Sequence, residues 1–231
     1  GVVGLAVLAS RLLGLVREQL FAALFGAGRE LDAFVTAFRI PNLFRDLFAE
    51  GALSAAFVTT FSQRMEKEGD ESAWRLANLV IHALALVVGA VVVLGVLGAP
   101  WVVAAIAPGF RAIAGKAELT TSLTRLMCPF LLLVALAAVA MGMLNAKNRF
   151  GVAASASSFF NLGSIVGGLA AAWWLAPEYL SSLARGAGGT GETGLPGDAE
   201  RAIVGMAIGT LIGGGLQLLV QIPSLFRMGF R

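Results

Sequence analysis

Six apolar segments, each long enough to cross a lipid bilayer as a helix, dominate this chain of 231 residues. The hydrocarbon core of a bilayer is about 30 Å thick, so a helix that crosses it needs about 20 apolar residues. The segments cover residues 2–25, 31–61, 76–97, 119–144, 150–176 and 202–226. The sequence therefore predicts an all-α, polytopic transmembrane helix bundle of about six spans. We expect an interruption at Ile40-Pro41 inside the second span and a break at Pro100 after the third.

Composition narrows the class of protein further. Hydrophobic residues make up 58% of the chain and charged residues only 13%, against about 25% charged residues in soluble domains. The net charge is +3, but the basic residues are scattered along the chain and form no solvated stripe, which excludes a nucleic-acid partner. With one Cys and one His, we expect no metal site and no cofactor. No acidic pair separates an acid from a base, so we expect no enzyme.

Two glycine runs lie inside apolar spans, at Gly167-Gly168 and at Gly213-Gly214-Gly215. Neither run is followed by the Lys-Ser/Thr of a nucleotide-binding loop. The runs therefore predict close packing between membrane helices.

Lysine and arginine in the connections between spans predict the orientation, because they are enriched on the cytoplasmic side. One side of the bundle carries Arg64, Lys67, Arg75, Lys147, Arg149, Arg227 and Arg231, and the other carries Arg29, Arg111, Lys116 and Arg185. This bias places both termini in the cytoplasm. The start at Gly1 and the stop at Arg231 lead us to expect a fragment of a longer protein.

The first two spans differ from the others because charged residues lie inside them. These residues are Arg11, Arg17, Glu18, Asp32, Arg39, Arg45, Asp46 and Glu50. A charged side chain that faces lipid at the bilayer centre costs at least ~2.5–3.5 kcal/mol. Together they would cost on the order of 10–20 kcal/mol even after snorkelling, which exceeds the stability of a typical domain. They must face each other, water or a ligand.

Helical spacing predicts which of these residues lie on one face. A polar stripe on the second span consists of Asp32, Thr36, Arg39, Asp46, Glu50 and Ser54, which recur at intervals of three, four or seven residues. Arg45 lies off this stripe in a straight helix, but a kink at Pro41 could redirect it. On the first span Arg11 and Glu18 share a face, and Arg17 is turned away by about a third of a turn.

Two interpretations of this charge are open. Four arginines and four carboxylates could pair fully and hold the two helices together. Alternatively, four arginines without a lysine suit the planar, bidentate recognition of phosphate or carboxylate. We favour recognition, because charge inside a membrane usually marks a functional site.

Motifs at these residues resemble one membrane protein family. They are SRLLGLVRE at 10–18, FGAG at 25–28, FRIPNLFR at 38–45 and FAEGALS at 48–54. These motifs, and shorter ones along nearly the whole chain, are similar to the MurJ (MviN) family of lipid II flippases. That family belongs to the multidrug/oligosaccharidyl-lipid/polysaccharide exporter superfamily. The chain departs from some members at Asp46, where they carry a second basic residue.

The resemblance implies a fold and a function. It implies a transporter of the bacterial inner membrane that moves lipid II, the undecaprenyl-diphosphate-linked peptidoglycan precursor, by alternating access. This chain would be the N-terminal lobe, and the C-terminal lobe and membrane lipids would be its partners. By the resemblance, Ser10, Arg11, Arg17 and Arg45 bind the substrate, and Glu18, Asp32, Arg39 and Glu50 line the cavity or its gate.

Other functions stay open at the level of sequence. The nearest is another exporter of the same superfamily, either a polysaccharide-precursor flippase or a drug/cation antiporter; an antiporter should have an acidic cavity. A membrane enzyme that acts on polyprenyl phosphates would need a histidine-acid or metal-binding motif on a loop, and none is evident. Charge inside the spans disfavours a non-transporting scaffold.

Overall fold

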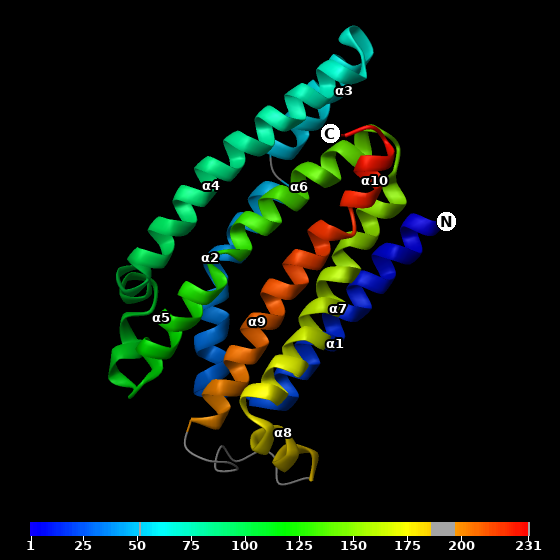
Figure 1. Ribbon diagram of the computed structural model, residues 1–231. Helices are drawn as coiled ribbons and strands as arrows, with labels where there is room; N and C mark the ends of the chain where they lie inside the picture. Colours follow the sequence, from blue (N-terminus) through cyan, green and yellow to red (C-terminus); the bar gives the residue numbers. More distant parts are fainter. Residues whose placement is uncertain (51, 186–196, 231) are drawn as a thin grey trace.

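The protein is a bundle of long helices (Figure 1). The computed structural model describes the backbone of residues 1–50, 52–185 and 197–230, and the side chains of these residues except residue 2 and residues 44–54. The described backbone contains helices and no strand, which confirms the predicted all-α fold class. The elements are α1 (Val2–Phe25), α2 (Arg29–Glu50), α3 (Ala52–Glu68), α4 (Asp70–Ile106), the short 3₁₀ helix η1 (Pro108–Ala112), α5 (Lys116–Met127), α6 (Phe130–Ala146), α7 (Phe150–Leu175), α8 (Pro177–Ala184), α9 (Asp198–Leu219) and α10 (Ile222–Arg227).

Four segments of the described chain are long and apolar enough to cross a membrane. They are α4, α5 with α6, α7, and α9 with α10. The first two predicted spans are also helical, as α1 and as α2 followed by α3. Charged residues inside these helices distinguish them from the four apolar segments. α1, for example, contains Arg11, Arg17 and Glu18.

The sequence predicts breaks at two prolines, and neither break is present. Pro41 lies inside α2 and Pro100 lies inside α4, so neither ends its helix. Proline lacks an N–H, which leaves the carbonyl of Val96 without its usual donor in α4. Arg125 of α5 donates from Nε to that carbonyl at 3.3 Å. A donor from a neighbouring helix thus replaces the missing bond, as membrane helices require.

The chain crosses the bundle back and forth between its two ends (Figure 1). Figure 1 shows both chain termini at one end, together with the α3–α4 and α6–α7 connections. The α1–α2 turn, η1 and α8 lie at the opposite end. We call these the terminal end and the far end. α1 packs mainly on α7, and α2 packs on α5 and α6, with α9 in contact with α2, α5, α6 and α7.

The contact between α7 and α9 is made by small residues. A Cβ on Gly205 would lie 2.4 Å from the Cα of Ala172, and one on Gly209 would lie 2.3 Å from the Cα of Gly168. One on Gly213 would lie 2.4 Å from the carbonyl oxygen of Phe160. Since the three glycines are four residues apart, they share one face of α9. The two backbones therefore touch, which confirms the packing predicted from the glycine runs.

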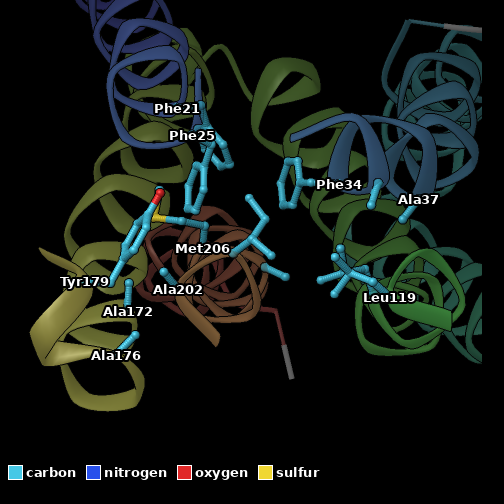
Figure 2. Close-up of a cluster of buried hydrophobic side chains, with 14 of the residues drawn as sticks. Phe21, Phe25, Phe34, Ala37, Leu119, Ala172, Ala176, Tyr179, Ala202 and Met206 are labelled. Carbon is cyan, nitrogen blue, oxygen red and sulfur yellow. The ribbon is translucent and has the colours of Figure 1, made fainter. Parts of the chain in front are cut away.

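A hydrophobic cluster at the far end joins α1 and α2 to α8 and α9. Figure 2 shows Phe21 and Phe25 of α1, Phe34 of α2 and Tyr179 of α8 around Met206 of α9. The Tyr179 hydroxyl donates to the carbonyl of Leu24 at 2.6 Å. Burial and the charge of Glu30 raise the pKa of Tyr179, so the hydroxyl keeps the proton that it donates. This hydrogen bond holds the end of α1 against α8.

We predict that Gly209→Ala destabilises the protein by about 1–3 kcal/mol, because its methyl group would overlap the backbone of Gly168. Gly215→Ala is the matched control in the same helix, since no atom lies within 4 Å of its added Cβ. It should be neutral or stabilising, because alanine favours helices by about 1 kcal/mol over glycine. The measurement is the apparent Tm of the full-length variants in detergent. Equal Tm values for the two variants would contradict the close contact.

Candidate functional site

A hollow of about 560 Å³ lies between α1 and α2. Its walls are two helices that make little direct contact with each other, because α1 is held by α7 and α2 by α5 and α6. One residue of α9, Thr210, also lines it. The lining residues are Arg17, Glu18, Phe21, Ala22, Leu31, Phe34, Val35, Thr36, Phe38, Arg39, Asn42 and Thr210. We call this hollow the α1–α2 cavity.

Among the residues whose side chains are described, those that carry charge on this cavity are two arginines and one glutamate. Arg17 and Glu18 come from α1 and Arg39 from α2, which gives a net lining charge of +2 − 1 = +1. Glu18 and Arg39 form no ion pair with any described side chain. The guanidinium carbon of Arg17 lies 5.1 Å from the ring centroid of Phe160 on α7, within cation–π range. Glu18 and Arg39 thus line the cavity without an ion pair to another described side chain.

Ser10 and Arg11 line a different hollow, of about 360 Å³, nearer the terminal end. Its other polar residues are Asn145 of α6 and Ser157 of α7. We call it the α1–α6 hollow. Asn161 of α7 donates from Nδ2 to the carbonyl of Ser10 at 3.0 Å and so fixes α1 on α7. Arg11 and Arg17 are six residues apart, about 9 Å along the helix, and this distance separates the two hollows. Glu18 shares a helix face with Arg11 but lines the α1–α2 cavity beside Arg17, so the grouping predicted on the first span is wrong.

Asp32 does not line the α1–α2 cavity, although the predicted stripe grouped it with Thr36 and Arg39, which do. Its carboxylate lies 3.0 Å from Nζ of Lys116 at the start of α5. The Lys116 side chain is only 6% exposed, and its Nζ lies 4.1 Å from the ring centroid of Phe110. Thr36 and Arg39 of the stripe line the cavity, but the first turn of α2 lies beside α5, so Asp32 pairs there.

An ion cluster at the far end involves residues to which the sequence analysis gave no role in a site. Arg29 of α2 bonds the carboxylates of Glu30 and Glu200, and its Nη1 donates to the carbonyl of Ala114 at 2.9 Å. The cluster joins the start of α2 to the start of α9 and to the segment before α5. The sequence places Arg29 in a connection between spans, but nothing in it shows which distant carboxylate faces Arg29.

The side chains of the remaining predicted site residues, Arg45 and Glu50, and of the stripe residues Asp46 and Ser54 are not among those that the structure describes. Arg45, Asp46 and Glu50 belong to the last part of α2, and Ser54 to α3, but only their backbone is described. Phe160 and Lys116 were missed as partners of Arg17 and Asp32. Phe160 is one apolar residue among many in its span, so the sequence does not mark it as a partner of an arginine. Lys116 lies in a connection like other lysines and arginines, so the sequence does not mark it as the partner of Asp32.

The described residues offer no metal site, since no three His, Cys, Asp or Glu side chains converge. His82 of α4 lies with Nδ1 2.7 Å from the carbonyl of Asn78 in its own helix, which agrees with a structural role. An arginine-bearing cavity in an apolar bundle can hold an anionic group, because each guanidinium offers paired donors to a phosphate or carboxylate.

Comparison with known proteins decides the family. A family model described as "Lipid II flippase MurJ" matches residues 21–231. This chain belongs to the MurJ family. Among its relatives, the lipid II flippase MurJ of Burkholderia cenocepacia is 35% identical over 218 residues, which are 94% of this chain and 38% of the relative. The probable lipid II flippase MurJ of Vibrio cholerae is 34% identical over 238 residues, 99% of this chain and 40% of the relative.

A solved structure of the MurJ family has the same fold. The structure titled "Lipid II flippase MurJ, inward closed conformation" is 28% identical, with a TM-score of 0.71, and the match covers 97% of this chain and 42% of that one. The chain thus spans about two fifths of the length of its relatives. The family model and the shared fold confirm the resemblance inferred from the motifs around Arg17 and Arg45. The name of the family describes a lipid transporter, a flippase.

We predict that the α1–α2 cavity is aqueous although it lies among membrane helices. In a cysteine-free full-length protein, Thr36→Cys in the cavity should react with a charged, membrane-impermeant thiol reagent. Leu86→Cys is the control, because Leu86 is 76% exposed on the lipid-facing side of α4. Charged reagents and thiolates are excluded from hydrocarbon, so we expect at least about tenfold slower labelling there. Labelling of Leu86→Cys as fast as Thr36→Cys would contradict an aqueous cavity.

Proposed function

We propose that this chain is the N-terminal six-helix lobe, residues 1–231, of a flippase that moves lipid II across the bacterial inner membrane. The observation that carries the proposal is the α1–α2 cavity, which holds Arg17 and Arg39 in a chain of the MurJ family. The names of the relatives supply the substrate. Membrane lipids and the C-terminal lobe of the same protein are the other partners.

The charge of the cavity matches the headgroup of a lipid diphosphate. A diphosphate is an anion with several acceptor oxygens, and arginine binds such groups with parallel, charge-assisted hydrogen bonds. Arg17 and Arg39 provide donors on opposite walls of the cavity. Arg45 is expected to contribute a third guanidinium on the basis of the motif. The described lining residues carry a net charge of +1, which attracts an anion.

The two hollows along α1 support a path for the diphosphate. Ser10 and Arg11 line the α1–α6 hollow nearer the terminal end, and Arg17 lines the α1–α2 cavity nearer the far end. A headgroup that leaves Arg11 meets Arg17 about 9 Å further along the same helix. The isoprenoid tail stays in the hydrocarbon of the bilayer, so no free energy is needed to transfer it into the protein. Rocking of this lobe against the second lobe would open the path to each side in turn.

Three carboxylates complete the proposed site. Glu18 lies on the wall of the α1–α2 cavity, where it can compete with the substrate for an arginine and so promote release. Asp32 and Glu50 keep the gate role that the resemblance implies. In this structure the Asp32 carboxylate pairs with Lys116, so opening of a gate at that position would have to break or carry along this pair.

We propose that the terminal end faces the cytoplasm. Both termini lie at this end of the bundle (Figure 1), together with Arg64, Lys67, Arg75, Lys147, Arg149 and Arg227. Cytoplasmic connections are enriched in lysine and arginine. In this orientation the Arg11 hollow is the first that a precursor made in the cytoplasm would reach.

We predict that Arg17→Ala in the full-length protein abolishes flipping, because one of the two described guanidinium groups of the α1–α2 cavity is lost. Arg75→Ala is the control, since Arg75 is exposed at the terminal end and its ion pair among the described residues is with Glu71, one turn away. The test is complementation of cells depleted of their own lipid II flippase, with the membrane level of each variant measured. Normal growth with Arg17→Ala would refute the site assignment.

A direct assay of transport tests the function itself. Cells depleted of their own flippase and expressing the complete gene should expose lipid II on the outer face of the membrane, where an added enzyme or binding reagent reaches it. We expect exposure with the wild-type and Arg75→Ala proteins and background exposure with Arg17→Ala. If the wild-type protein leaves lipid II inside, the substrate is that of another exporter in the superfamily.

A further inference from the structure

A third hollow, of about 470 Å³, lies at the far end, outside the cavity between α1 and α2. The last turns of α4, the 3₁₀ helix η1 and the first turns of α5 form it. Its polar side chains are Arg111, Glu118, Thr121, Ser122 and Arg125. We call it the α4–α5 pocket. None of these residues takes part in the proposed transport path.

The two arginines of this pocket have donors to spare. Arg125 uses Nε for the Val96 carbonyl, and its two Nη groups form no hydrogen bond within the described residues. Arg111 has no hydrogen bond or ion pair to any described residue, and both side chains are exposed. Ser122 adds a hydroxyl on the same face of α5 as Arg125. Among the described residues that line the pocket, Glu118 is the single carboxylate, so their net charge is +2 − 1 = +1.

The surroundings of the pocket are those of a membrane surface. Pro100 lines it, and the adjacent Trp101 is 75% exposed on α4. Ile106 and Ile113, on either side of η1, are 43% and 45% exposed. Tryptophan is enriched where the hydrocarbon of a bilayer meets the headgroups. Unpaired guanidinium groups beside exposed apolar side chains thus lie at headgroup depth, with acyl chains able to run along α4.

We propose that the α4–α5 pocket binds the phosphodiester of an anionic glycerophospholipid from the leaflet at the far end. Arg111, Arg125 and Ser122 donate to the phosphate oxygens, and the acyl chains lie on the apolar face of α4. The +1 lining neutralises a headgroup of charge −1, such as that of phosphatidylglycerol. Glu118 lies about two turns from Arg125 along α5 and weakens the attraction for the anion. The proposal requires the membrane location of the chain and does not rest on lipid II transport.

Two substitutions with opposite expected effects test the site. Arg111→Gln in the full-length protein should weaken binding of phosphatidylglycerol about tenfold, because a charge-assisted contact is lost. Glu118→Gln should tighten it several-fold, because the lining charge rises from +1 to +2. Arg75→Gln is the control for charge, since it removes an exposed arginine at the terminal end. Native mass spectrometry of delipidated protein titrated with phosphatidylglycerol gives the apparent Kd of each variant.

Competition distinguishes a lipid from a soluble phosphate. Inorganic phosphate or glycerol phosphate at millimolar concentration should not displace phosphatidylglycerol from the wild-type protein, because the acyl chains contribute to its binding. Displacement by either anion would overturn the lipid assignment in favour of a soluble ligand. Equal affinity of the Arg111→Gln, Glu118→Gln and Arg75→Gln proteins would overturn the site. Both readouts are independent of flipping, so loss of the transport function leaves this test intact.

Discussion

The direct contact of backbone with backbone between α7 and α9 is the constraint on which the arrangement of the lobe depends. Gly205, Gly209 and Gly213 bring α9 against Ala172, Gly168 and Phe160 of α7 without intervening side chains. Because α1 packs on α7, and α2 contacts α9 as well as α5 and α6, this one distance sets how far apart α1 and α2 stand. In a membrane, where lipid competes for every apolar surface, such close packing is what holds helices together.

The cavity between α1 and α2 follows from that arrangement. α1 is held mainly by α7, and α2 mainly by α5 and α6. Apart from the shared cluster at the far end, the space between α1 and α2 is lined in part by charged side chains. Phe21 and Phe34 line it and also belong to the buried cluster that contains Met206 (Figure 2), and ion pairs of Arg29 and Lys116 hold the start of α2. Charges that would be prohibitively costly in lipid are tolerated because they face this space.

Parts of the site could be predicted from single residues, and others could not. Arg17, Glu18 and Arg39 stood out because charge inside an apolar span demands a polar surrounding, and all three line one cavity. Asp32 has the right helical spacing but pairs with Lys116 instead. The break expected at Pro100 is absent, and the carbonyl that Pro100 leaves free accepts from Arg125, which belongs to a helix adjacent only in the folded chain. Rules based on helical spacing and proline apply to one helix at a time, so they cannot predict which side chains a neighbouring helix supplies.

The sequence by itself determined the class of fold, the number of apolar segments and the residues that cannot face lipid, because length, hydropathy and charge act through the transfer free energy of each residue. It also carried the motifs that mark the MurJ family. Only the tertiary structure decided that Arg11 and Arg17 line separate hollows and that Arg111 and Arg125 line a third. These are relations between helices distant in the chain, and they are set by how closely small residues let the backbones approach.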